Sequence, residues 1–316
     1  MIILTGGKTG GHIMPLIALA KVFDNVLYIG AKNSLEEKIC AKYEVEFYGL
    51  PLINKKIKNI IKAYKQVKIP KESIIISTGG YVSLPVLIYA VIHKIKIYLL
   101  EENLIMGTTN KIISLFAKKI FLTYELPTMN PKYKLVGLPL IHHKLNYIKY
   151  ANLNFDILII GGSLGSKPLC ELVYSLNEKY KICLIAGRYF KDYQNIKNVI
   201  TLEFVDDLPN LMLQAKLIIC RAGAGTTYET FYVNKPCIII PSLKTKKNHQ
   251  IINANYFKNK GCCININEKE AKKEILKAVK MLLSNEQMQA NQKINQKEII
   301  TNNSIEIIKR EINDDI

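Results

Sequence analysis

The chain has 316 residues, of which 49% are hydrophobic, and it carries a formal net charge of +18. This length suits two domains of ordinary size, and the apolar fraction excludes an intrinsically disordered chain. The charge favours a polyanionic partner (nucleic acid, acidic membrane or phosphorylated substrate), although lysines scattered through an Ile- and Asn-rich chain equally indicate a drift in composition.

Neither a targeting segment nor a membrane span is expected. Met1–Leu4 reaches a glycine-rich turn before an apolar core of signal-peptide length can form. The longest apolar stretch, Leu84–Leu100, is interrupted by His93, Lys94 and Lys96, whereas a bilayer span needs about 20 apolar residues. The seven cysteines contain no C-x-x-C pair, which favours thiols packed in the core in a reducing compartment over a disulfide or zinc framework.

Short apolar runs alternate with amphipathic stretches along the whole chain, which is typical of parallel βαβ units. Strands are expected, in chain order, near 2–5, 26–29, 45–48, 73–77, 96–100, 119–123, 134–136, 156–160, 181–186, 199–203, 216–220, 237–240 and 262–266. The predicted class is α/β, with two doubly wound Rossmann-like domains facing a cleft.

The linker between the domains is expected at Pro139 and the polar run Lys144–Asn154. This gives an N-terminal domain over 1–145 and a C-terminal domain over 155–316. The last helix is a candidate to pack back on the N-terminal domain.

The first strand runs into a turn that contains Thr9, Gly10 and Gly11 and ends in His12. His12 is the only histidine in the glycine turns of this chain, and imidazole has the intrinsic pKa of a general base. The alternative is a structural histidine that caps its own helix.

A second strand-to-glycine turn carries Gly161, Gly162 and Ser163. Glycines let backbone amides approach a ligand, and the helix that follows points its positive end to the same place, so a pyrophosphate is the expected guest. An ordinary turn between strand and helix would explain the pattern as well.

A third small-residue turn precedes the helix that contains Glu229. A carboxylate there can accept both hydroxyls of a ribose, although an acid in a first helical turn also stabilises the helix dipole. Gln250 opens another helix and could bind sugar hydroxyls, but an isolated glutamine is also typical of a solvated surface.

The sequence lacks a P-loop, a strict G-x-G-x-x-G fingerprint and a cluster placed to hold a divalent metal. No cofactor and no metal are therefore expected. The charge of a leaving diphosphate would be met by backbone amides, helix dipoles and cations such as Arg188 or Arg221.

The chain carries an ordered set of motifs: T-G-G-H at 9–12, G-G-Y-V-S at 79–83, T-N-K at 109–111, V-G-x-P at 136–139, G-G-S-x-G at 161–165, E-F-x-D-D at 203–207 and R-x-G-A-x-T-x-x-E at 221–229. As a set, these motifs resemble those of the MurG family, the peripheral-membrane N-acetylglucosaminyltransferases of peptidoglycan synthesis, which have the two-domain GT-B fold. The resemblance runs from the first glycine turn to at least Asn253.

The resemblance implies inverting, metal-independent transfer of GlcNAc from UDP-GlcNAc to the C4 hydroxyl of MurNAc in an undecaprenyl-pyrophosphate-linked precursor, lipid I, to give lipid II. It implies that His12 is the base. It also implies that diphosphates or sugars contact Thr9, Gly10, Gly11 and Asn103. In the second domain, the donor phosphates would contact Ser163, and the pyrophosphate and sugar would contact Ala224, Gly225 and Thr226. Uracil would contact Val205, ribose would contact Glu229, and GlcNAc would contact Gln250.

Three positions depart from the family pattern. The first turn has one extra residue, Lys8. The family's H-E-Q-N is Leu100–Asn103 here, and the arginine of G-N-P-V-R is replaced by Ile141. His142, His143 or Arg188 could substitute for that arginine. The three departures concern the catalytic rate and the identity of the acceptor more than the class of sugar donor.

The segment Ile53–Lys71 interleaves isoleucines with lysines. On a helix this gives an apolar stripe flanked by positive charge, suited to an anionic bilayer surface, so a peripheral position on the cytoplasmic face of the plasma membrane is expected. A core-facing amphipathic helix with a solvated basic face is the alternative.

Two other functions remain open. One is the same fold and donor with a different lipid acceptor, such as diacylglycerol or another polyprenyl lipid. The other is a basic nucleic-acid-binding or scaffold protein on a degenerate glycosyltransferase frame. Nucleic acid is not expected as a partner because the chain has no tryptophan, few aromatics beside its lysines and no nucleic-acid-binding motif.

Overall fold

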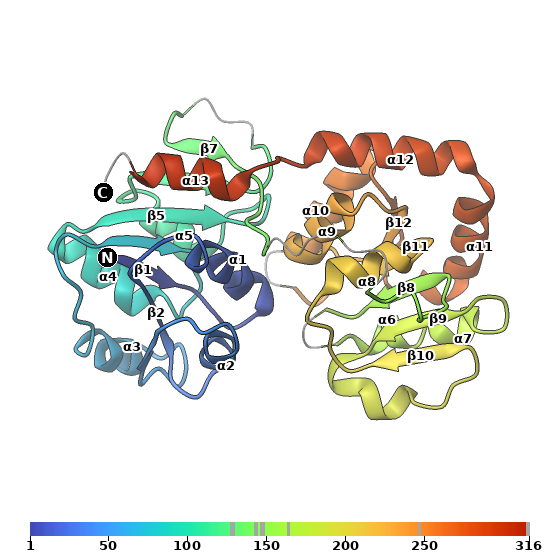
Figure 1. Ribbon diagram of the computed structural model, residues 1–316, viewed down its shortest axis with the longest axis horizontal. Coiled ribbons are helices and arrows are strands. Elements are labelled where there is room, and N and C mark those ends of the chain that lie inside the picture. Colours follow the sequence, from blue (N-terminus) through green and yellow to red (C-terminus); the bar gives the residue numbers. More distant parts are fainter. Residues whose placement is uncertain (127–129, 142–144, 146–148, 163–164, 246–247, 314–316) are drawn as a thin grey trace. The chain divides into compact units, whose positions relative to one another are not determined.

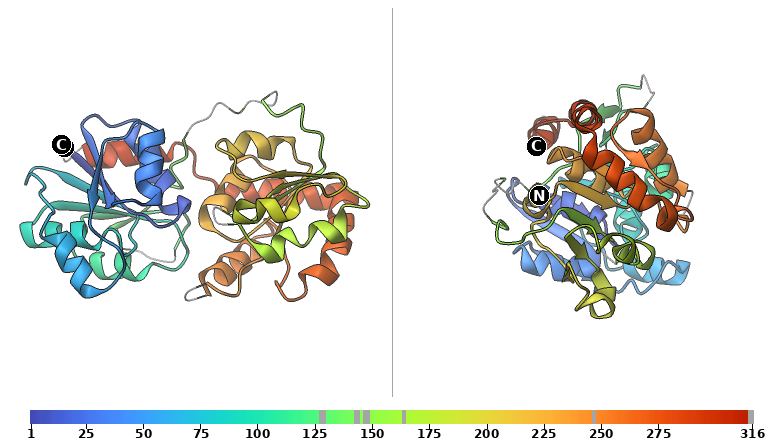
Figure 2. Two further views of the ribbon diagram at one scale, coloured as in Figure 1. Left: turned by 90° about the horizontal axis from the view of Figure 1, so that it is seen from below. Right: turned by 90° about the vertical axis from the view of Figure 1, so that its right-hand side faces the viewer.

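Figures 1 and 2 show the computed structural model of the protein. It describes residues 1–126, 130–141, 145, 149–162, 165–245 and 248–313. The chain forms two compact units, Met1–His142 with Thr301–Ile316, and His143–Ile300. The sequence analysis placed 155–316 in the second domain and made the last helix a candidate to pack back on the first. In the structure Thr301–Ile316, which contains that helix, belongs to the first unit.

The first unit contains a seven-stranded sheet in the order β3-β2-β1-β4-β5-β6-β7, and every pair of neighbours is parallel. Its strands are β1 (Ile2–Thr5), β2 (Val26–Ala31), β3 (Phe47–Leu50), β4 (Ile74–Ser77), β5 (Lys96–Glu101), β6 (Lys119–Leu122) and β7 (Tyr133–Leu135). Continuous apolar strands such as β1 and β4 are typical of parallel sheets buried on both faces.

Helices cover both faces of this sheet (Figures 1 and 2). They are α1 (Gly10–Ala20), α2 (Leu35–Lys42), α3 (Ile57–Tyr64), α4 (Leu84–His93), α5 (Thr108–Ile113) and α13 (Ser304–Asn313). Alternate residues of β1 enter opposite cores: Ile2 and Leu4 pack with α1 and α13, whereas Ile3 packs with α4. The sheet is therefore doubly wound.

Helix α13 is fastened to the first unit by polar contacts as well as by its apolar face. Glu311 pairs with Lys119 and Lys134, and the Tyr98 hydroxyl donates to the Glu311 carbonyl over 3.4 Å. Ser304 donates to the carbonyl of Leu138 over 3.0 Å. These contacts join the end of the chain to strands β5, β6 and β7 and to the residues just after β7.

The second unit contains a six-stranded parallel sheet in the order β10-β9-β8-β11-β12-β13. Its strands are β8 (Ile157–Ile160), β9 (Ile182–Ile185), β10 (Val199–Leu202), β11 (Leu217–Cys220), β12 (Cys237–Ile239) and β13 (Ile264–Asn265). Its helices are α6 (Lys167–Cys170), α7 (Val173–Leu176), the 3₁₀ helix η1 (Gly187–Tyr193), α8 (Leu208–Gln214), α9 (Ala224–Tyr232), α10 (His249–Asn259), α11 (Ala271–Ser284) and α12 (Glu286–Ile299).

Both sheets confirm the predicted α/β class with two Rossmann-like parallel sheets. In each, the strand order reverses direction beside the first strand, between β1 and β4 and between β8 and β11. Ligands of open α/β sheets bind outside the carboxyl ends of the strands at such points. All seven cysteines are buried with free thiols, as their apolar surroundings predicted.

Candidate functional site

The glycine turn after β1 is shaped by contacts that leave no space for side chains. A Cβ on Gly6 would lie 2.0 Å from Oγ1 of Thr78, which follows β4. The same Thr78 hydroxyl donates to the carbonyl of His12 over 2.8 Å, and the Tyr28 hydroxyl donates to the carbonyl of Gly6 over 2.9 Å. The turn is thus fixed to strands β2 and β4, and α1 begins from a defined position.

Lys8, the extra residue of this turn, adopts a left-handed backbone with φ of 81°. Its amide donates to the carboxylate of Glu36 over 3.4 Å, and its ammonium lies 5.7 Å from the centre of the Tyr81 ring. Glu36 is buried and also accepts from the amide of Ala31 over 3.3 Å. The insertion is therefore accommodated by a buried acid on α2.

His12 lies in the first turn of α1, after Thr9, Gly10 and Gly11. Its Nδ1 is buried and lies 3.4 Å from Oε1 of Glu102, whose side chain is 4% exposed, whereas the His12 side chain is 30% exposed. Burial by itself lowers the pKa of His12, but the charge and hydrogen bonding of Glu102, with a further contribution from Glu101, raise that pKa above 6.5. The structure thus supplies a partly exposed imidazole whose Nδ1 is shielded beside a buried carboxyl group.

Glu101 organises the loop that carries Glu102 and Asn103. Its buried carboxylate accepts from the amide of Asn103 over 3.1 Å, from the amide of Gly107 over 3.0 Å and from Nδ2 of Asn110 over 3.0 Å. Burial raises the pKa of Glu101, and these hydrogen bonds oppose the rise. Asn103 is thereby held at the carboxyl end of β5, on the loop that also carries Glu102.

The turn after β8 depends on glycine for a different reason at each position. Gly162 and Gly165 have φ of 82° and 74°, a region that favours glycine. A Cβ on Gly165 would lie 2.2 Å from the carbonyl oxygen of Ala186, whereas a Cβ on Gly162 would meet nothing within 4 Å. At Gly161 a Cβ would lie 2.8 Å from the amide nitrogen of Ser166. The predicted phosphate contact Ser163 lies outside the described residues.

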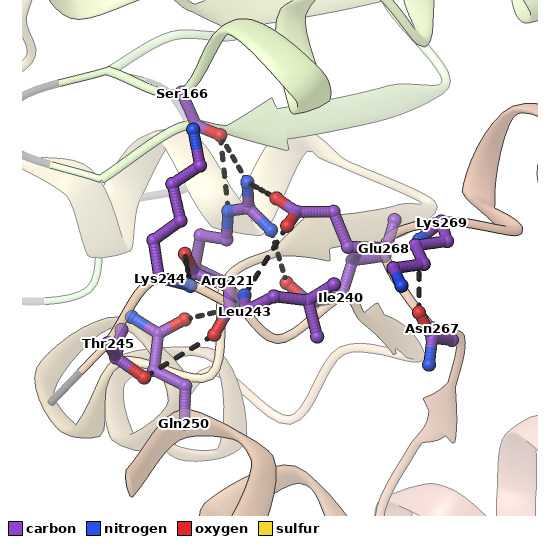
Figure 3. A network of polar contacts seen from close by, with 11 residues as sticks. Ser166, Arg221, Ile240, Leu243, Lys244, Thr245, Gln250, Asn267, Glu268 and Lys269 are labelled. Atoms are coloured by element: carbon purple, nitrogen blue, oxygen red, sulfur yellow. Dashed lines mark hydrogen bonds and ion pairs between the residues drawn. The ribbon is translucent and has the colours of Figure 1, made fainter. Parts of the chain in front are cut away.

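Arg221 follows β11 and is the centre of a polar network (Figure 3). Arg221 is 8% exposed and pairs with Glu268. Its Nε and Nη2 donate to the hydroxyl of Ser166 over 3.1 and 2.6 Å, and its Nη1 donates to the carbonyl of Ile240 over 3.1 Å. Burial lowers the pKa of Arg221, and Glu268 opposes that shift. These donors are directed at protein partners, so Arg221 links the end of β11 to Ser166, to the end of β12 and to Glu268.

Gln250, in the first turn of α10, joins the same region (Figure 3). Its Oε1 accepts from the amide of Ser242 over 2.8 Å. The next amide, of Leu243, donates to Glu268 over 3.3 Å. Gln250 is therefore anchored through its oxygen to the loop after β12, beside the Arg221 network.

Glu229 lies on α9, one turn after Ala224, Gly225 and Thr226. Among the described residues, no hydrogen bond or ion pair to its half-buried carboxylate is found, and burial raises its pKa from 4.5 to about 7. A partly buried carboxyl without a protein partner can accept hydrogen bonds from a ligand.

Arg188 and Val205 lie at neighbouring strand ends of the same unit. Arg188 is exposed in η1, stacks 4.9 Å from the centre of the Tyr189 ring and donates to the Tyr189 hydroxyl over 2.9 Å. The Tyr189 ring would lie 3.2 Å from a Cβ on Gly165, so Arg188 stands beside the second glycine turn. Val205 is half-buried after β10.

Each unit thus brings together its own part of the predicted set. The first unit gathers the turn from Thr9 to His12 with Asn103, and the second gathers Gly161, Gly162, Gln250 and the start of α9. The sequence interpretation missed two partners, Glu102 against His12 and Glu268 against Arg221. Glu102 lies in the strand-end segment Leu100–Asn103 that departs from the family's H-E-Q-N, and the sequence does not pair it with His12. Within the described part of the chain, no group of three His, Cys, Asp or Glu residues is placed to hold a metal ion.

Comparisons with known proteins cover both units. The model of the glycosyltransferase family 28 N-terminal domain matches residues 2–122, and that of the family 28 C-terminal domain matches residues 156–310. A UDP-N-acetylglucosamine–N-acetylmuramyl-(pentapeptide) pyrophosphoryl-undecaprenol N-acetylglucosamine transferase from Sulfurihydrogenibium sp. (strain YO3AOP1) is 32% identical over 303 residues, which cover 87% of each chain. The enzyme of the same name from Clostridium perfringens (strain SM101 / Type A) is 32% identical, with 98% of each chain covered.

Solved structures agree with the fold. The crystal structure of MurG from Acinetobacter baumannii matches with a TM-score of 0.78 at 23% identity and covers 99% of each chain. The calicheamicin glycosyltransferase CalG4 matches with a TM-score of 0.72 at 10% identity and covers 99% of this chain and 97% of its own. These likenesses confirm the GT-B fold class of the two Rossmann-like domains.

Proposed function

Because the chain belongs to glycosyltransferase family 28 and, within it, to the MurG family, we propose that it transfers GlcNAc from UDP-GlcNAc to the C4 hydroxyl of MurNAc in undecaprenyl-pyrophosphoryl-MurNAc-pentapeptide (lipid I), forming lipid II. The observation that carries the reaction type is the buried contact between His12 Nδ1 and Glu102. It leaves the other ring nitrogen available as a base at the end of a glycine turn, at the point where open α/β sheets bind ligands.

The second unit is proposed as the donor half-site. The glycines after β8 and the start of α9 present backbone amides to a diphosphate, and the positive end of α9 favours its charge. Glu229 would accept the ribose hydroxyls, Val205 would lie against the uracil, and Gln250 and Thr226 would contact the GlcNAc and the diphosphate. Arg188 is an exposed cation beside the glycine turn and is proposed to take the place of the missing family arginine.

The first unit is proposed as the acceptor half-site. The acceptor C4 hydroxyl gives its proton to Nε2 of His12 as its oxygen forms a bond to C1 of GlcNAc. The bond from C1 to the phosphate oxygen breaks at the same time, and UDP leaves with the bonding electron pair. This single displacement inverts the anomeric configuration. Asn103, held by Glu101, would bind the acceptor.

The exposed residues of helix α3 and of the segment around it, Ile53–Lys71, are consistent with an acceptor that is bound to a membrane. Ile53, Ile57 and Ile61 are 83%, 75% and 50% exposed, whereas Ile60 and Ala63 pack against the core. The lysines of this segment are also exposed (Lys55, Lys56, Lys58, Lys62, Lys65 and Lys68). None of the described helices is both long and apolar enough to span a bilayer. We propose that this exposed surface of α3 holds the protein on the cytoplasmic face of the plasma membrane.

The membrane proposal is tested by sedimentation with anionic vesicles. Replacing Ile57 and Ile61 with Gln should reduce bound protein, and raising the salt should reduce it further because part of the attraction is electrostatic. Ile294→Gln is the matched control, since Ile294 is 59% exposed on α12 of the other unit. Equal loss in the control would contradict the assignment to α3.

The catalytic proposal is tested first by calorimetric titration with UDP-GlcNAc in EDTA, with UDP-glucose as the control donor. Selective binding is then followed by a transfer assay with lipid I and with diacylglycerol and a polyprenyl phosphate as competing acceptors. Transfer to lipid I alone supports the proposal, whereas preferred transfer to another lipid would reassign the acceptor. Failure to bind either nucleotide would overturn the donor site.

A further inference from the structure

The carboxyl group of Glu102 stands where the family motif H-E-Q-N has an amide. Glu102 is 4% exposed and follows β5 directly. A charged side chain is rarely buried so deeply unless a partner compensates it. The nearest candidate partner is His12, which is far away in the sequence and comes from a different element.

The contact between the two side chains is direct and shielded from solvent. Nδ1 of His12 lies 3.4 Å from Oε1 of Glu102. Both atoms are buried, and within the described part of the chain neither has a hydrogen-bond partner elsewhere. A Cβ on Gly11 would lie 3.5 Å from the other carboxyl oxygen of Glu102, so the glycine before His12 lets the carboxyl group lie close to the start of α1.

The adjacent acid cannot take this part. Both oxygens of Glu101 are engaged, one by the amide of Asn103 and the other by Gly107 and Asn110. The charged groups that act on His12 from the surrounding elements are Glu102 and, more weakly, Glu101. The two neighbouring acids therefore divide the work, since Glu101 holds the loop and Glu102 faces the imidazole.

We propose that Glu102 is a positioning residue that fixes the proton of neutral His12 on Nδ1 and thereby presents Nε2 as the base toward the acceptor. The inference rests on the proposed function of His12. When Nε2 takes the hydroxyl proton, the ring becomes an imidazolium, and the Glu102 carboxylate stabilises that charge without itself accepting the proton. A glutamine can still accept a hydrogen bond from Nδ1 but lacks the charge.

Two variants separate orientation from charge. Glu102→Gln restores the amide of the family motif and should keep the Nδ1–H tautomer, whereas Glu102→Leu removes the acceptor altogether. We expect kcat to fall by about tenfold or less for the Gln variant and by about a hundredfold for the Leu variant, with the KM for UDP-GlcNAc unchanged in both. These losses are smaller than or equal to those expected for removing a general base.

The pH dependence gives a readout that a purely structural role would not move. Loss of the negative charge lowers the pKa of His12, so the acidic limb of kcat/KM should move to lower pH by about one unit in Glu102→Gln. Titration of the ¹⁵N-labelled imidazole by NMR should show the same shift, and the neutral ring of the wild-type protein should carry its proton on Nδ1. Glu311→Gln, a carboxyl-to-amide change at the Lys119–Glu311–Lys134 contact, should leave both readouts unchanged.

The outcomes distinguish this inference from the proposed function. An unshifted His12 titration in Glu102→Gln would overturn the inference, and so would a loss of kcat with no movement of the acidic limb. If the acceptor has been assigned wrongly, the wild-type protein fails in the lipid I assay while the NMR titration still reports the His12–Glu102 pair.

Discussion

The glycine turns after β1 and β8 share one plan but have opposite electrostatic surroundings. The turn of the first unit is surrounded by buried acids, of which Glu36 holds the backbone of Lys8 and Glu102 faces His12. The turn of the second unit has the buried cation Arg221 behind it, neutralised by Glu268. In the proposed function, these two copies of the same βαβ start would serve as a place to move a proton and a place to bind a diphosphate.

The difference also lies in what the glycines do. In the first turn Gly6 leaves space for the side chain of Thr78, so a side chain shapes the backbone. In the second, Gly162 and Gly165 adopt positive φ, so the backbone itself forms the surface offered to a ligand. In the proposed function, an ionisable side chain would carry the chemistry of the first turn and backbone amides that of the second.

The largest effect on activity is expected from removing the histidine of the first turn. His12→Ala should reduce kcat by about 10²–10⁴-fold because the acceptor hydroxyl loses its base, while UDP-GlcNAc binding to the other unit stays normal. The measurement is the rate of transfer to lipid I together with calorimetric donor binding. His93→Ala is the control, since His93 stacks 3.9 Å from the Tyr89 ring on α4. Near-normal turnover of His12→Ala would remove His12 from catalysis.

The second-largest effect is expected on stability, from replacing Arg221 next to the turn that follows β8. Arg221→Met leaves Glu268 without its partner and should lower the free energy of unfolding by about 3–5 kcal/mol. The double variant Arg221→Met, Glu268→Gln should recover much of that loss, because no uncompensated charge remains. Urea denaturation followed by fluorescence measures both. If the double variant is no more stable than the single one, the pair is not the source of the loss.

A third experiment compares two glycines that share a positive φ. Gly162→Ala adds only the strain of a left-handed residue, about 1–2 kcal/mol, because its Cβ meets open space. Gly165→Ala adds a collision with the carbonyl of Ala186 at 2.2 Å and should destabilise the second unit more. Thermal unfolding ranks the two, and equal losses would contradict the packing argument. Both should weaken donor binding if the turn holds the diphosphate.

The smallest expected effect is the pH dependence of Glu229. Because burial raises its pKa from 4.5 to about 7, the folded protein binds a proton more readily than the unfolded one, so its contribution to stability falls as pH rises from about 4.5 to 7. Glu229→Gln should remove this slope. UDP-GlcNAc affinity should rise through pH 7 in the wild type, as the carboxylate forms, and be weaker and flatter in the variant. Calorimetry at pH 6 and pH 8 measures it, and a donor affinity that the substitution leaves unchanged counts against ribose binding.

The local pattern of the sequence was sufficient to predict the strands and the glycine turns of both units. Alternating apolar runs and amphipathic stretches predicted every strand of both sheets, although β3 begins two residues later than the expected 45–48 and β13 is reduced to Ile264–Asn265. The glycines that follow β1 and β8 and the single histidine among them were visible because strand, turn and helix are consecutive along the chain. Such features depend on backbone sterics and periodicity, which neighbouring residues determine.

Only the tertiary structure decided which side chains meet. Glu102 faces His12 because the end of β5 and the start of α1 lie at the same edge of the parallel sheet, and Glu268 neutralises Arg221 because the loop before α11 returns to the end of β11. Where the sequence left alternatives open, the structure decides: the last helix belongs to the first unit, and the isoleucines of α3 divide between core and solvent. Contacts of this kind depend on strand order and on the direction of each side chain, and neither is contained in the spacing of residues along the chain.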